Sequence, residues 1–106
     1  MSTKGTRAVD FLQELVGGPL TLGDLLHSIR RGEDMSQVDF ARQLGLSRSH
    51  LCDIEKGRKA VSPRRAAEFA RRLGYSERQF VQLALQGQVQ DAGLDFEVQL
   101  VAAPAV

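Results

Sequence analysis

The sequence predicts an all-α protein built from five short helices, with an extra N-terminal helix and a C-terminal β-strand. Two observations predict the helices: residues that cap helix starts recur between positions 21 and 79, and glycines follow the apparent last turns. A third observation, the alternation of apolar and polar residues over 94–100, predicts the strand. The chain has 106 residues, and its 42% hydrophobic content suffices for one packed core.

The central helices are delimited by local signals at both ends. Their starts are marked by capping boxes or near variants and by a serine followed by proline at the first helical position: Thr21-x-x-Asp24, Ser36-x-x-Asp39, Ser62-Pro63 and Ser76-x-x-Gln79. Their stops are marked by Gly32, Gly45, Gly57 and Gly74. These signals predict helices over about 22–31, 37–44, 47–56, 63–73 and 77–86, whose apolar residues recur at helical spacing.

Two flanking segments complete the predicted organisation. A helix is expected from Arg7 to Val16, where Gly17, Gly18 and Pro19 end it. We therefore expect an N-terminal helical extension (1–20), a central helical domain (21–87), and a C-terminal strand and tail (88–106).

The predicted strand places its apolar residues on one face: Leu94, Phe96, Val98 and Leu100. No second strand is evident in the chain, and an unpaired strand exposes backbone groups that favour a partner. The simplest partner is the same strand of a second copy, antiparallel about a two-fold axis, which would form a homodimer. The alternative is a disordered tail that alternates by chance.

Composition and charge narrow the function classes. The net charge is +1, but residues 22–75 carry 11 basic and 7 acidic side chains, and such an excess indicates either a phosphate-binding face or a solvated helix surface. A single cysteine, Cys52, and the lack of a leader or a long apolar run favour a cytoplasmic protein with no membrane span. No metal, cofactor or catalytic constellation is expected, because the residue patterns of such sites are missing.

Residues 36–57 form the most informative segment: a capped helix, a tight turn and a second capped helix. Ala41 is small enough for two helices to cross closely, Gly45 permits a turn with positive φ, and Ser47 caps the second helix. This spacing makes the second helix project from the domain. Such a helix fits the major groove of duplex DNA, which is about 12 Å wide.

The sequence from about Leu22 to Phe80 resembles the Xre/Cro family of helix-turn-helix regulators, which includes the phage repressors. The residues that carry the resemblance are Ile29-Arg30, Met35-Ser36-Gln37, Phe40-Ala41, Leu44-Gly45-Leu46-Ser47, Leu51, Ile54-Glu55-Lys56-Gly57 and Leu73-Gly74-Tyr75. The resemblance implies a five-helix DNA-binding domain of the phage-repressor type that is not an enzyme, and small members of this kind include antitoxins.

Roles follow from the resemblance position by position. Arg48, Ser49 and Asp53 lie on the exposed face of the recognition helix and are expected to read bases. Asp53 departs from the usual Gln or Arg, so it either accepts from a cytosine amino group or holds Arg48 in place. Contacts to the DNA backbone are expected from Gln37, Ser47, His50, Lys56, Arg58, Lys59, Arg64 and Arg65. Arg30 and Glu55 match an ion pair between the first and third helices, although a weak surface pair is the alternative.

These features predict a dimeric transcriptional repressor that reads an inverted repeat in double-stranded DNA through helix 47–56. The alternative is an antitoxin that neutralises a cognate toxin and represses its own operon, with Arg7–Val16 or Leu94–Leu100 as the toxin contact. A purely protein-binding module is also compatible with the fold, since a fold does not dictate function.

Overall fold

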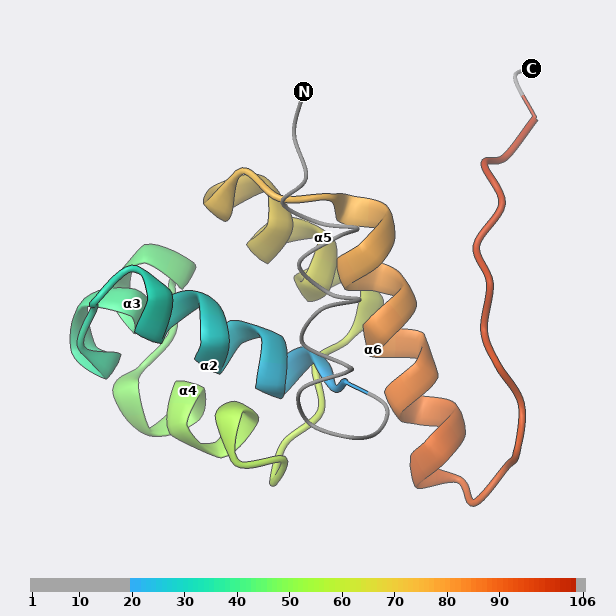
Figure 1. The fold of residues 1–106 in the computed structure, drawn as a ribbon, viewed down its shortest axis with the longest axis horizontal. Coiled ribbons are helices and arrows are strands. Elements are labelled where there is room, and N and C mark those ends of the chain that lie inside the picture. Colours follow the sequence, from blue (N-terminus) through green and yellow to red (C-terminus); the bar gives the residue numbers. More distant parts are fainter. Residues whose placement is uncertain (1–19, 105–106) are drawn as a thin grey trace.

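The computed structural model describes residues 20–104, and every regular element within them is an α-helix (Figure 1). The helices are α2 (Leu22–Gly32), α3 (Gln37–Leu44), α4 (Arg48–Glu55), α5 (Pro63–Leu73) and α6 (Glu77–Asp91). The all-α prediction for the central domain is therefore confirmed. The predicted helix from Arg7 to Val16 lies outside the described residues.

Each helix begins at a hydroxyl side chain that caps its free N–H groups. The side chains of Thr21, Ser36, Ser47, Ser62 and Ser76 each accept a hydrogen bond from the backbone N–H three residues later. Only Thr21 belongs to a complete capping box, because Asp24 accepts in return from the N–H of Thr21. The predicted helix starts thus agree with the structure to within one residue.

The helix ends agree less completely with the expected glycine stops. Gly45, Gly57 and Gly74 adopt positive φ after α3, α4 and α5. Gly32 instead closes α2 as a helical residue, and the positive φ falls on Asp34 (58°), which an aspartate tolerates better than most residues. The last helix, expected over 77–86, continues to Asp91, because Gly87 is accommodated within it and the left-handed residue is Gly93.

One apolar core joins the five helices. Its largest fully buried side chains are Phe40, Phe69, Phe80, Leu25, Leu26 and Leu51. α2 contacts both α4 and α6, while α3 packs against α4 and α5, and α5 packs along α6. Figure 1 shows α2, α3 and α4 grouped on one side and α5 and α6 on the other. No helix within residues 20–104 has both the length and the apolarity needed to cross a membrane.

The predicted C-terminal strand is wrong. Residues 94–104 leave α6 as an extended chain with no ladder partner among the described residues (Figure 1). The side chain of Gln86 takes the place of a neighbouring strand: its amide nitrogen donates to the carbonyl of Phe96 (2.8 Å), and its oxygen accepts from the N–H of Val98 (2.7 Å).

The four apolar residues predicted to form one face of the strand are also not all buried. Leu94 and Phe96 are 51% and 68% exposed, whereas Val98 and Leu100 are half-buried. Alternating polarity therefore identified an extended chain but not its pairing, since a strand needs a second backbone beside it and this segment lies beside a helix.

Candidate functional site

The turn between α3 and α4 sets the start and the direction of α4. Gly45 adopts φ +74°, and the N–H of Leu46 donates to the carbonyl of Ala41 (2.8 Å), which reverses the chain after α3. Ala41 is only 1% exposed, so it lies within the packed core. Ser47 then caps α4 by accepting from the N–H of His50 (3.1 Å). These local bonds set where α4 starts.

The surface of α4 is divided between a buried face and an exposed face. Leu51 and Ile54 are buried in the core. Arg48 and Ser49 are exposed, and Asp53, one turn after Ser49, is partly exposed. The helix therefore presents its N-terminal polar residues to the outside of the molecule.

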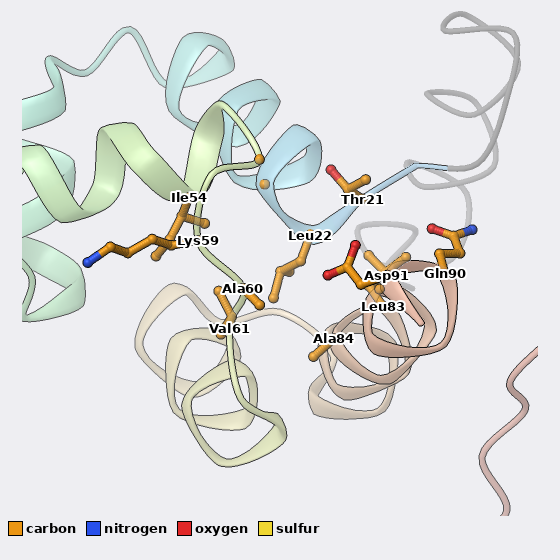
Figure 2. Close-up of a pocket in the computed structure, with 13 residues that line it drawn as sticks. Thr21, Leu22, Ile54, Lys59, Ala60, Val61, Leu83, Ala84, Gln90 and Asp91 are labelled. Carbon is orange, nitrogen blue, oxygen red and sulfur yellow. The ribbon is translucent and has the colours of Figure 1, made fainter. Parts of the chain in front are cut away.

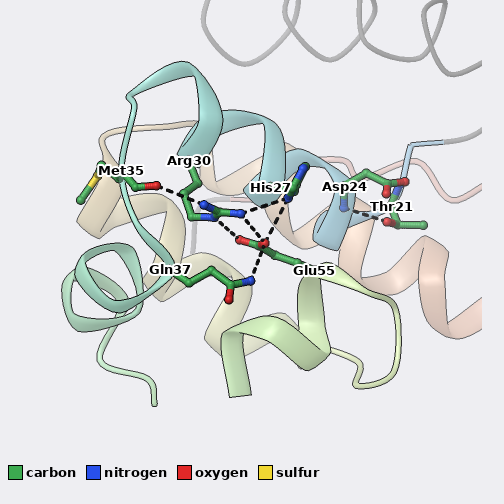
Figure 3. A network of polar contacts seen from close by, with 7 residues as sticks. All are labelled: Thr21, Asp24, His27, Arg30, Met35, Gln37 and Glu55. Carbon is green, nitrogen blue, oxygen red and sulfur yellow. Dashed lines mark hydrogen bonds and ion pairs between the residues drawn. The ribbon is translucent and has the colours of Figure 1, made fainter. Parts of the chain in front are cut away.

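A polar network behind this surface connects α2, α3 and α4 (Figure 3). Arg30 donates from Nε and a terminal nitrogen to the two oxygens of Glu55 (2.9 and 3.1 Å), and from its other terminal nitrogen to the carbonyl of Met35 (3.1 Å). The Glu55 carboxylate also accepts from the amide nitrogen of Gln37 (3.2 Å) and contacts His27 Nδ1 at 3.1 Å. Gln37, expected at the DNA backbone, is thereby held against α4.

The Glu55 carboxylate is buried, with 3% of its side chain exposed. Burial alone raises the pKa of such a group, but hydrogen bonds from Arg30, His27 and Gln37 and the charge of Arg30 outweigh it, so the pKa lies below its usual value. Glu55 is consequently a charged group at neutral pH. The pair that the sequence suggested is a two-point contact inside a larger network, and the sequence did not indicate that His27 and Gln37 join it.

The basic side chains of α3, α4, α5 and the loops between them differ in whether an acidic side chain pairs with them. Arg42, Arg58 and Arg71 form ion pairs with Asp39, Asp53 and Glu77. In the part of the chain that the structure describes, no ion pair is made by the remaining basic residues expected at DNA, which are Arg48, Lys56, Lys59, Arg64 and Arg65. All five are exposed, so their charges are available to an anionic partner.

An open hollow of about 410 Å³ brings several of the expected residues together between α2, the start of α3 and α4. Its lining includes Gln37, Arg48 and Lys56, beside Cys52 and the Glu55 network. Arg64 and Arg65 are placed elsewhere, in the first turn of α5, where the Ser62 side chain accepts from the N–H of Arg65 (3.2 Å). The expected site is thus an extended surface rather than a single pocket.

A second, smaller hollow of about 110 Å³ lies between the start of α2, the loop from α4 to α5, and α6 (Figure 2). Its walls are mainly apolar, and they include Leu22, Ile54, Val61 and Leu83. Of the expected DNA contacts only Lys59 lines it. This hollow is therefore distinct from the polar surface of α4.

Comparison with protein families identifies this arrangement of helices. The model of a family described as "Helix-turn-helix domain" matches residues 21–83, more than half of the chain. The chain belongs to this helix-turn-helix family. The match covers α2 to α5 and the first half of α6, and α3 and α4 correspond to the helix-turn-helix unit that the sequence predicted. Searches of curated proteins and of solved structures gave no match.

The helix-turn-helix surface also contains contacts that sequence reasoning missed. Asp53 was expected to read a base or to hold Arg48, but its carboxylate accepts from Nε of Arg58 at 3.1 Å. The turn at Gly57 was the available signal, because such a helix end brings the chain back toward the preceding turn. Arg72 approaches the carbonyl of Gln43 (3.4 Å) across α5 and α3, a contact that no local pattern indicates.

Proposed function

We propose that this helix-turn-helix protein is a sequence-specific DNA-binding regulator of transcription that inserts α4 into the major groove. The observation that carries the proposal is the exposed start of α4, where Arg48 and Ser49 point away from the core beside positive charges that no described acid pairs. A projecting helix with such donors matches the width and the donor–acceptor pattern of the groove.

Individual roles follow from the chemistry of each group. Arg48 offers a planar fork of donors that fits the O6 and N7 acceptors of guanine, and Ser49 bonds a base edge or a phosphate. Gln37 lines the same hollow as Arg48, and one hydrogen of its amide nitrogen bonds Glu55, so the other remains for a phosphate oxygen. Backbone contacts are assigned to Ser47, His50, Lys56, Arg58, Lys59, Arg64 and Arg65.

Selection of binding sites from a random duplex pool, followed by affinity measurements with Arg48→Ala, tests this assignment. The variant should lose about 1–3 kcal/mol of discrimination at one base pair of the selected site. Arg78→Ala removes an exposed arginine from α6, outside α3 and α4, and is the matched control with unchanged preference. Equal base preference in wild type and Arg48→Ala would exclude base reading by this residue.

The regulator is further proposed to repress transcription as a homodimer that reads an inverted repeat. The support is the resemblance of the sequence to repressors, in which two recognition helices lie about 34 Å apart on successive major grooves. Light scattering of the full chain should then give the mass of two copies, and the selected site should be a palindrome. A monomer bound to an asymmetric site would contradict the dimeric arrangement.

Toxin neutralisation is a second candidate function, compatible with the first. The extended tail supports it, because Leu94, Phe96 and Val101 are large apolar side chains that are 51–89% exposed and therefore suit a protein partner. A neighbouring reading frame whose product arrests growth alone, but not when co-expressed with this chain, would establish it. Equal growth arrest with and without this chain would exclude it.

A further inference from the structure

The end of α4 adopts a defined backbone motif. The N–H of Gly57 bonds the carbonyl of Ile54 (3.1 Å), the N–H of Arg58 bonds that of Asp53 (2.8 Å), and Gly57 has φ +76°. These two bonds and the left-handed glycine form a Schellman motif. The motif brings together the side chain three residues before the C-cap residue, Lys56, and the side chain two residues after it, which here are those of Asp53 and Arg58.

In such motifs these two positions frequently make an apolar contact. Here they make an ion pair instead, in which Nε of Arg58 donates to Oδ1 of Asp53 at 3.1 Å. The Asp53 side chain is 31% exposed and that of Arg58 is 59% exposed. An exposed pair of this kind adds little to the stability of a fold, so stability alone gives a weak reason for an acid on a surface that is to meet DNA.

The geometry of the pair leaves part of Arg58 unused. Only Nε is bonded to Asp53, and no described residue accepts a hydrogen bond from the two terminal nitrogens. The terminal nitrogens form the edge of a guanidinium that binds a phosphate in a two-point contact. Asp53 lies one helical turn after Ser49, on the same face of α4. Because Arg58 is paired with Asp53, it extends this exposed face past the C-terminal end of α4.

We infer that Asp53 is a positioning residue that holds the Arg58 guanidinium against the end of α4, with its terminal nitrogens presented to a phosphate of bound DNA. This inference rests on the proposed DNA-binding function and replaces the base-reading role expected for Asp53. Anchoring at both the backbone and Nε reduces the side-chain freedom that Arg58 loses when it binds, which favours the complex.

Whether Asp53→Ala weakens or tightens DNA binding shows whether Asp53 positions Arg58 or only repels the phosphates. A carboxylate that only faces the phosphates opposes binding, so its removal tightens the complex. If Asp53 positions Arg58, Asp53→Ala instead weakens the complex although the protein has lost a negative charge. We expect about fivefold weaker binding to a random-sequence duplex about three helical turns long, because phosphate contacts do not depend on sequence.

Matched variants of the full chain test whether the effect passes through Arg58. Asp39→Ala removes an acid from another exposed pair, Asp39–Arg42 (3.2 Å), and should leave affinity unchanged or raised. Asp53→Asn keeps an oxygen acceptor for Nε and removes the negative charge, so it should bind at least as tightly as the wild type. Arg58→Ala should make the plot of log binding constant against log salt concentration less steep by about 0.9, because one phosphate contact is lost. Adding Asp53→Ala to this variant should weaken binding no further. Thermal unfolding of each variant checks that the fold is intact.

The outcomes separate this inference from the proposed function. Weaker binding by Asp53→Ala that disappears in the Arg58→Ala background supports the positioning role. Unchanged or tighter binding by Asp53→Ala, while wild type binds in a salt-dependent manner and Arg48→Ala binds more weakly, overturns the positioning role alone. A wild-type chain that binds no duplex at low salt overturns the proposed function and this inference together.

Discussion

The contact between α2 and α4 makes a sharp prediction at Gly23. A Cβ built on this residue would overlap the backbone carbonyl oxygen of Ile54, in the last turn of α4. Overfilling a packed core displaces side chains and backbone, which costs about 1–3 kcal/mol. Here the obstacle is backbone, so the upper end of that range applies.

Alanine also favours a helix over glycine by no more than about 1 kcal/mol. The net expectation for Gly23→Ala is therefore a loss of about 2 kcal/mol in the free energy of unfolding. For a domain of this size that corresponds to a midpoint lower by about 8–16 °C. Because α4 would have to move away from α2, the geometry of the proposed DNA-reading surface would change as well.

Gly87→Ala is the matched control for this prediction. Gly87 lies within α6, and its added Cβ would meet no atom of residues 20–104 within 4 Å, so only the helix preference remains. This variant should be more stable than the wild type by about 0.5–1 kcal/mol. Calorimetry or urea unfolding measures both variants. A Gly23→Ala protein as stable as Gly87→Ala would refute the close approach of α2 and α4.

Three further predictions concern the network, the cap and the tail. Because hydrogen bonding holds the pKa of Glu55 below 4.5, the stability it contributes is complete above that pH and is lost as the pH falls through the lowered pKa. Glu55→Gln should therefore lower the free energy of unfolding by about 3 kcal/mol at neutral pH and by less in acid, as measured by urea unfolding at several pH values. If the stabilities of Glu55→Gln and wild type instead changed with pH in parallel, this role of Glu55 would be contradicted. Ser47→Ala removes the cap of α4 and should lower the unfolding free energy by about 1 kcal/mol, whereas Ser47→Asp, which keeps an acceptor, should not. Gln86→Ala should accelerate hydrogen exchange at the N–H of Val98, and an unchanged rate would show that Gln86 does not hold the tail.

Local sequence signals were sufficient to predict a helix boundary where that boundary depends on only a few neighbouring residues. Ser47 bonds an N–H only three residues away, and Gly45 adopts a conformation that few other residues tolerate. Such positions are visible in a single sequence. The end of α6 was less visible, because Gly87 resembles a stop but meets no obstacle inside the helix.

Contacts between distant parts of the chain were harder to predict. The alternation over 94–100 revealed an extended chain, but the side chain that bonds it, Gln86, belongs to a helix ten residues earlier. The partner of Asp53 followed from the backbone motif after α4, which sets positions five residues apart beside each other. In both cases the sequence pattern describes a single segment, whereas the contact that forms depends on a residue outside that segment.

The most direct test of the proposed function is an NMR titration of the full chain with duplex DNA from the selected pool, following backbone amide resonances. If α4 enters the major groove, the largest shifts occur at Gln37, at the start of α4, and at residues 56–59 and 64–65. These shifts should also weaken steeply as salt is added, because salt weakens phosphate contacts. Shifts confined to α6 and residues 94–104, or no shifts at low salt, would contradict the placement of DNA on α4.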